Sequence, residues 1–171
     1  APTVLSIVGI EPPDYMQGHA FMGAYAAPAP RFQFGFRDRM DERYDMCRSV
    51  RNDRYVYVRN YKPHKVYGQY LAYMFQTPTT VVWKRMYDEG KLNPAQSIFW
   101  ETKPAEELFD LENDPYEVNN LATNPNFQDV LEELRLAEQA WVKSIRDVGF
   151  LPENEMHSRA GGATIYEMAQ D

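Results

Sequence analysis

The chain has 171 residues, a net charge of −7, and 44% hydrophobic and 14% aromatic residues. This content of apolar side chains is enough to fill the core of one ordinary domain, and it excludes the disordered and fibrous classes. No apolar run approaches the roughly 20 residues that a membrane-spanning helix needs, and we expect neither a membrane nor a nucleic acid as partner.

The first residues carry a helical pattern. Residues 3–10 place Val4, Leu5 and Val8 on one face, and Gly9 followed by two prolines supplies the signals that end a helix. We expect the last turns of a helix that begins upstream. Residues 25–30 are predicted to be a connector, because their prolines remove donors and favour extended backbone.

The next stretch changes to a period of two, which is typical of strands. Residues 31–37 alternate phenylalanines with polar or small neighbours, and residues 44–51 and 54–61 alternate around Asn52-Asp53. We predict a first strand and then a hairpin. Both faces of residues 55–60 are partly apolar, so the sheet is expected to be covered on at least one side.

Helical signals dominate the middle of the chain. Residues 62–76 show no clean period and are predicted to form a long structured loop. Thr77-Pro78 predicts the start of a helix that ends at Gly90, and Asn93-Pro94 predicts a shorter helical turn.

The last third combines one strand with the longest helix. Residues 106–111 are predicted to be a short strand closed by turn residues. Asn124-Pro125 starts a helix with apolar residues at three- and four-residue steps, which we expect to end at Gly149. The polar, glycine-containing tail after Pro152 is interpreted as a linker.

Positive charge is concentrated in one region. Residues 31–65 contain ten Lys or Arg and five Asp or Glu. The other positions of the chain contain eight Lys or Arg and twenty Asp or Glu. Clustered cations on an acidic body attract a negative ligand. A sheet that carries solvated arginines explains the same pattern, and the charges alone do not decide between the two.

The densest polar cluster lies at residues 37–43, at the end of the first predicted strand. Arginine forks match sulfate and carboxylate geometry, and neighbouring acids orient them or accept sugar hydroxyls. Alternating charges also form surface networks without a function. His64 lies between two lysines of the basic loop, where its imidazole could donate to an anionic ligand.

Nucleophile and metal motifs are missing from the sequence. Cys47 is the single cysteine, which excludes an internal disulfide and a cysteine-based zinc site. It falls in a strand pattern, where a small buried residue is expected rather than a reactive thiol. The three histidines are far apart and lack metal-ligand spacing.

Two segments resemble the type I sulfatases. Ala1-Pro2-Thr3 through Gly9-Ile10 and Met16-Gln17-Gly18 resemble the segment that follows the catalytic core in that family. Residues 107–115, with Asn120-Leu121-Ala122, resemble the family element that precedes the terminal helix. Residues 34–51 and 60–69 are similar to the subgroup related to heparan N-sulfatase.

The resemblance implies an α+β fold. A small antiparallel sheet of about four strands would pack against a long C-terminal helix, next to an N-terminal remnant of an α/β catalytic domain in the alkaline phosphatase-like superfamily. It assigns residues 1–25 to that remnant, 26–150 to the C-terminal subdomain and 151–171 to a linker. The expected partner is the N-terminal catalytic domain, which is missing from this chain, and the family implies a periplasmic or secreted location.

The resemblance also implies a formylglycine nucleophile made from a cysteine, and a calcium ion. Cys47 has the cysteine-to-arginine spacing of the nucleophile motif, but Ser49 and Val50 depart from its pattern. No residue of this chain is therefore expected to act as nucleophile or metal ligand, or to hold a cofactor. The small domain of the family closes one wall of the pocket for a sulfated carbohydrate, and the candidates for that wall are Arg37, Asp38, Arg39, Asp41, Glu42, His64 and Gln69.

Two other functions stay open at this point. The chain could belong to a phosphoester or phosphonate hydrolase of the same superfamily, or it could be a stand-alone anion- or partner-binding module. The leading hypothesis is the C-terminal part of a sulfatase, a hydrolase of sulfuric esters or sulfamates, which is inactive by itself.

Overall fold

A computed structural model describes residues 1–170 of the chain. They form two compact units, residues 1–31 and the residues from Phe32 onward. The first unit extends past residue 25, where the sequence placed a boundary, and the assignment of 1–25, 26–150 and 151–171 to domains stays a prediction. None of the described helices is long and apolar enough to cross a bilayer.

The first unit folds around one short helix, α1 (Pro2–Ile7). The helix ends earlier than the pattern over 3–10 predicts, and Gly9 has a φ of +77° just beyond it. The Ser6 hydroxyl, which is buried, accepts a hydrogen bond from the Tyr25 amide at 2.8 Å. Gly23 lies so close to the Ser6 backbone that a Cβ would meet it at 2.4 Å. The returning loop therefore packs directly on the helix.

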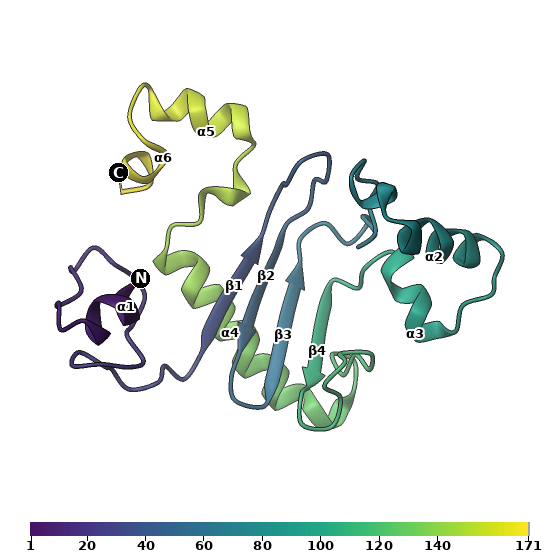
Figure 1. The fold of residues 1–171 in the computed structure, drawn as a ribbon, viewed down its shortest axis with the longest axis horizontal. Coiled ribbons are helices and arrows are strands. Elements are labelled where there is room, and N and C mark those ends of the chain that lie inside the picture. Colours follow the sequence, from purple (N-terminus) through teal and green to yellow (C-terminus); the bar gives the residue numbers. More distant parts are fainter. Residues whose placement is uncertain (171) are drawn as a thin grey trace. The chain divides into compact units, whose positions relative to one another are not determined.

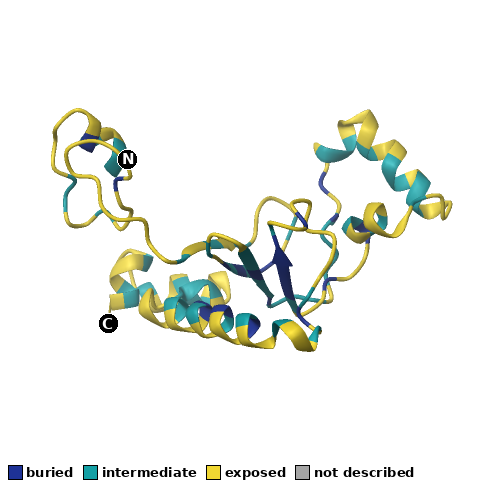
Figure 2. Ribbon diagram, turned by 90° about the horizontal axis from the view of Figure 1, so that it is seen from below, coloured by how far each residue is buried: buried dark blue, intermediate teal, exposed yellow. Residues whose placement is uncertain are grey.

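The second unit contains a four-stranded antiparallel sheet in the order β1-β2-β3-β4 (Figure 1). The strands are β1 (Gln33–Arg37), β2 (Cys47–Arg51), β3 (Tyr55–Asn60) and β4 (Glu106–Asp110). The long helix α4 (Gln128–Ser144) lies along one face of this sheet (Figures 1 and 2). The predicted α+β class, with a small antiparallel sheet and a long helix, is confirmed.

The core lies between the sheet and α4. Val50, Tyr57 and Leu108 are paired across neighbouring strands and point toward the helix, which contributes Leu131 and Leu134. All five side chains are at most 2% exposed. Burying an aliphatic side chain of this size stabilises a fold by about 1.5–3 kcal/mol, so this layer holds the helix on the sheet.

The predicted hairpin at Asn52-Asp53 is confirmed, because β2 and β3 pair directly on either side of it. The Asn52 side chain accepts hydrogen bonds from the backbone amides of Arg54 and Tyr55, at 3.0 and 2.7 Å. Asparagine commonly stabilises a turn through such contacts with the backbone that follows it.

A helical segment connects β3 to β4. It contains the 3-10 helix η1 (Met74–Gln76), α2 (Pro78–Asp88), α3 (Pro94–Ser97) and the 3-10 helix η2 (Ile98–Trp100). The helices predicted at Pro78 and Pro94 are confirmed, and a capping box between Asn93 and Gln96 starts the second one. Trp83 stacks on Phe99 with ring centroids 4.7 Å apart. The segment is thus packed around aromatic rings.

Polar residues organise the segment at the end of β4, which is the second segment that resembles the sulfatases (residues 107–115 and 120–122). The Asp110 carboxylate accepts hydrogen bonds from Arg54 at 2.9 and 2.6 Å, and Asp114 accepts one from the Asn119 amide at 2.7 Å. Asn120 accepts hydrogen bonds from the Leu108 and Ala122 amides, both at 3.0 Å. These polar residues fold the chain back from the sheet toward α4.

The end of α4 differs from the prediction. The 3-10 helix η3 (Pro125–Phe127) precedes it, and the helix stops at Ser144 rather than Gly149. Arg146 adopts a φ of +50°, which is incompatible with a continued helix, and the 3-10 helix η4 (Val148–Phe150) follows. The tail that we interpreted as a linker contains two helices, α5 (Glu153–Ala160) and α6 (Ile165–Gln170).

Candidate functional site

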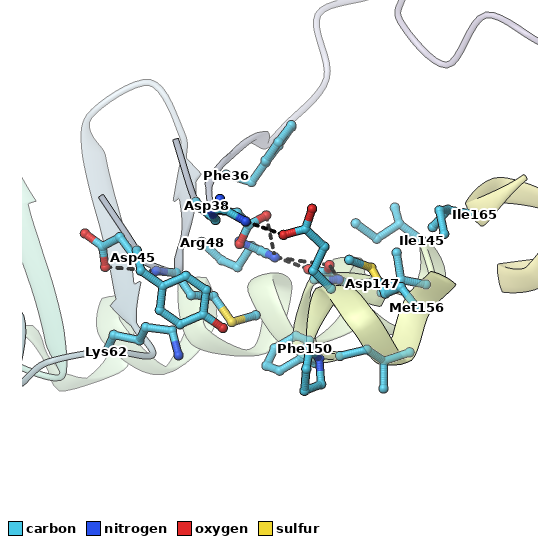
Figure 3. A pocket seen from close by; sticks show the side chains of 18 of the residues that line it. Phe36, Asp38, Asp45, Arg48, Lys62, Ile145, Asp147, Phe150, Met156 and Ile165 are labelled. Atoms are coloured by element: carbon cyan, nitrogen blue, oxygen red, sulfur yellow. Dashed lines mark hydrogen bonds and ion pairs between the residues drawn. The ribbon is translucent and has the colours of Figure 1, made fainter. Parts of the chain in front are cut away.

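A cleft of about 930 Å³ lies at the end of the sheet where β1 leads into β2. Its lining comes from the turn between these strands, the end of α4, the segment 147–152 and the two last helices. Lys62 and Asp45 lie at one end, and Ile145, Met156 and Ile165 lie at the other (Figure 3). The cleft therefore has one charged end and one apolar end.

Arg48 lies between these ends, and its side chain is only 1% exposed. Its Nε donates to Asp147 Oδ2 at 2.5 Å, and its Nη1 donates to Asp38 Oδ1 at 2.9 Å (Figure 3). Burial works to lower the pKa of Arg48, but the hydrogen bonds to Asp147 and Asp38 outweigh it and raise the pKa. Because both partners are anionic, this guanidinium is a structural bridge and not a free anion-binding group.

Gly149 makes room for this bridge. A Cβ at this position would lie 2.4 Å from Arg48 Nη2 and 2.9 Å from Asp147 Oδ1. We expect Gly149→Ala to destabilise the second unit by about 1–3 kcal/mol, as overpacking does, and hydrogen exchange of the sheet amides would measure it. Gly18→Ala is the control, because its Cβ meets nothing closer than 3.6 Å. Equal exchange in both variants would contradict this role of Gly149.

Two other cations of the cleft are less constrained. Arg39 Nη1 pairs with the Glu153 carboxylate, and these two side chains are 58% and 59% exposed. The Lys62 ammonium lies over the Tyr44 ring, 4.4 Å from its centroid. The turn that carries Arg39 is tight, with Met40 and Arg43 paired through both backbone hydrogen bonds and Asp41 at a φ of +50°. This turn presents Arg39 to solvent.

A second buried ion pair lies beside the cleft. The Lys103 ammonium pairs with Asp45, and the two side chains are 0% and 1% exposed. The Cys47 thiol lies 3.1 Å from Asn60 Oδ1 and 3.8 Å from Lys103 Nζ. Burial raises the pKa of Cys47, so its sulfur stays protonated and is a poor nucleophile.

The structure brings together only some of the residues predicted for the substrate wall. Asp38, Arg39 and Asp41 line the cleft, whereas Arg37, Glu42, His64 and Gln69 do not. His64 and Glu42 are exposed, Arg37 is half-buried, and Gln69 donates to the Tyr44 carbonyl at 3.4 Å. The role of all seven in substrate binding stays a prediction.

Sequence reasoning missed five charged residues of the cleft, namely Asp45, Arg48, Lys62, Asp147 and Glu153. Lys62 belongs to the basic loop that drew attention to His64, so its charge was a usable signal. Arg48 interrupts the apolar alternation on the strand face that packs on α4, which is a second signal. Nothing in the sequence pairs Arg48 with Asp147, which lies about a hundred positions away.

The groups that the resemblance implies are a calcium ion and a formylglycine. No group of three or more His, Cys, Asp or Glu side chains within residues 1–170 is arranged to hold a metal ion. Cys47 lies in β2 outside the cleft lining, and its thiol is held by the hydrogen bond to Asn60. These residues do not fit a calcium site, and Cys47 does not fit a formylglycine.

Comparison with known proteins finds sulfatases among the relatives of this chain. No family model matches the chain. Over 157 residues the chain is 43% identical to an ulvan-active sulfatase of Formosa agariphila, a match that covers 91% of this chain and 26% of that protein. The chain is thus homologous to part of a sulfatase. A second ulvan-active sulfatase of the same organism is 29% identical over 164 residues, or 90% of this chain and 29% of that protein.

Solved structures support the fold of this chain. Two solved structures match with a TM-score of 0.53 each. One is a Bacteroides thetaiotaomicron protein described as a sulfatase, at 20% identity, and the other is a 2-O GAG sulfatase, at 19% identity. Both matches cover 84% of this chain and 23% of the other. A protein in complex with its substrate D-glucosamine-2-N,6-O-disulfate matches with a TM-score of 0.53 and 14% identity, over 88% of this chain and 25% of that one.

The share of each relative that the chain matches indicates that the chain corresponds to one portion of a sulfatase. The chain spans about a quarter of the length of the curated relatives that it matches. This share agrees with the predicted C-terminal portion of a sulfatase, whereas the two other functions left open by the sequence are not favoured.

Proposed function

We propose that this chain is part of an enzyme that hydrolyses sulfuric esters or sulfamates of a sulfated carbohydrate. Its own contribution would be a scaffold and one wall of the substrate pocket. The observation that carries the proposal is the 43% identity to an ulvan-active sulfatase across nearly the whole chain. Ulvan is therefore the first substrate to test.

The geometry of the cleft supports a role in binding. Arg39 lies on an exposed turn, and its guanidinium can present two parallel N–H groups to a sulfate or carboxylate. Asp41 lines the same cleft and offers acceptors for sugar hydroxyls. Arg48 holds the end of β1 and the segment after α4 in place, so that these groups are positioned by a buried bridge rather than by loops alone.

The chemical step would use groups outside this chain. In the remainder of the enzyme, a formylglycine side chain would supply the nucleophile, and a metal ion would stabilise charge on the sulfate oxygens. The residues described here bind and orient the remainder of the substrate and exclude water from one side of the pocket. In this proposal the catalytic remainder of the sulfatase is the direct partner of the chain.

The test uses the full-length protein and measures sulfate release from ulvan oligosaccharides. We expect Arg39→Ala to lower kcat/KM by more than about tenfold, or about 1.4 kcal/mol of transition-state stabilisation. Arg85→Ala, which removes an exposed arginine of α2, is the control and should leave kcat/KM unchanged. An unchanged kcat/KM in the Arg39 variant would remove Arg39 from the substrate wall.

The same assay tests the reaction class. Phosphate monoesters and phosphonates are measured in parallel, at the same concentrations. Faster hydrolysis of these compounds than of sulfated substrates would contradict the sulfatase proposal and favour a phosphoester or phosphonate hydrolase.

A further inference from the structure

Three cationic side chains of Arg or Lys line the cleft, and they are not equivalent. Arg48 is enclosed and already paired with two carboxylates, so a ligand would have to break a buried bridge to reach it. Arg39 and Lys62 are accessible, and none of the ion pairs among residues 1–170 includes Lys62. Binding of an anionic ligand would therefore depend on Arg39 and Lys62.

The contact between Arg39 and Glu153 is easily exchanged. It is a single pair between side chains that are both more than half exposed, and such pairs add little stability. The Glu153 carboxylate contacts Nη1 of Arg39, whereas a sulfate or carboxylate of a ligand could engage the guanidinium through two parallel hydrogen bonds. A ligand anion can thus replace Glu153 with a gain in hydrogen bonding.

The size and composition of the cleft limit the kind of ligand. Its volume of about 930 Å³ far exceeds that of one sulfate group and is near the upper end of small-molecule sites, which are roughly 300–1,000 Å³. Aromatic side chains, including Phe36, Trp141 and Phe150, line it beside the cations. Such rings offer flat apolar surfaces on which the C–H faces of sugar rings can pack.

We propose that Glu153 pairs with Arg39 only while the cleft is empty. An anionic group of the ligand then displaces Glu153 from Arg39, and Lys62 binds a second anionic group of the ligand. The ligand is an acidic oligosaccharide with at least two negative groups. This inference deepens the proposed function and rests on it for the carbohydrate nature of the ligand. It makes Glu153 a competitor of the substrate and not a substrate-binding residue.

The test measures binding to the full-length protein by calorimetric titration with a dextran sulfate oligosaccharide, and with neutral dextran of the same length. Glu153→Gln should tighten dextran sulfate binding about threefold or more, because it removes a competing ion pair of modest strength. Arg39→Ala and Lys62→Ala should each weaken binding about tenfold, the loss of one charge-assisted contact.

Glu155→Gln is the matched control for Glu153→Gln. It removes the same charge from the same helix, but Glu155 pairs with Arg159 and does not line the cleft. Its dextran sulfate affinity should equal that of the unmodified protein. A gain as large as that of Glu153→Gln would mean general electrostatic attraction and would overturn the competitor role, as would unchanged or weaker binding in Glu153→Gln.

Two further outcomes bear on the ligand. Neutral dextran that binds as tightly as dextran sulfate would overturn the requirement for negative groups, and an unchanged affinity in Lys62→Ala would overturn the second anionic contact. Sulfate release is measured separately. If these binding results hold in a protein that releases no sulfate from any substrate, the proposed function fails while the acidic-ligand cleft stands.

Discussion

Replacement of Arg48 by alanine is expected to destabilise the second unit by about 3–5 kcal/mol, the usual cost of removing one partner from a buried ion pair. The variant would leave the Asp147 carboxylate, whose side chain is only 9% exposed, without its cation. It would also release Asp38, and with it the connection between the end of β1 and the segment after α4.

The consequence should reach the cleft as well as the fold. Asp38 immediately precedes Arg39, and Asp147 lies six positions before Glu153, so the Arg48 bridge positions both members of the exposed pair. Arg48→Lys should recover only part of the loss, because an ammonium cannot present the planar fork that reaches two carboxylates.

Hydrogen exchange of peptides from β1 to β4, measured by mass spectrometry in the full-length protein, would report the change in local stability. Arg51→Ala is the matched control: the residue lies in the same strand, but it is exposed, so the change should stay within about 0.5 kcal/mol. Similar exchange in the Arg48 and Arg51 variants would show that the bridge does not stabilise the unit.

The sequence predicted those elements that carry their own local signals. The hairpin at Asn52-Asp53, the helix starts at Pro78 and Pro94 and the strand that ends at Asp110 all follow from period, proline position and turn residues. The end of α4 was missed because apolar spacing continues to Ile145, while the positive φ of Arg146 breaks the helix. The helices α5 and α6 were missed because they are short and because two glycines, Gly161 and Gly162, lie between them.

The candidate cleft was harder to predict, for a geometric reason. The turn that carries Asp38, Arg39 and Asp41 could be singled out by its charge density. Glu153 is the partner of Arg39, and Asp147 is linked to Asp38 through Arg48; both lie about a hundred residues away, on the segment that follows α4. No local pattern encodes that pairing, because it depends on the packing of α4 against the sheet.

Replacement of Lys103 by methionine should also cost about 3–5 kcal/mol, since it leaves the Asp45 carboxylate buried and unpaired. The two side chains are almost fully enclosed, and Asp45 Oδ2 already has no hydrogen-bond partner among the described residues. The remaining contacts of Asp45 Oδ1, with the Met46 amide at 2.9 Å and the Cys47 thiol at 3.7 Å, cannot compensate for a missing cation.

A double-mutant cycle distinguishes the pair from the packing of each side chain. Asp45→Asn alone should be similarly destabilising because it leaves the Lys103 ammonium unpaired. The double variant, Asp45→Asn with Lys103→Met, should be more stable than either single variant, since no net charge is then buried without a partner. Lys91→Met is the control, because its partner Glu89 and Lys91 itself are 42% and 64% exposed. Strictly additive losses in the cycle, measured by hydrogen exchange of the β2 and β3 amides, would mean that the two charges do not stabilise each other, and that the energetic role of Lys103 lies in the packing of its aliphatic stem.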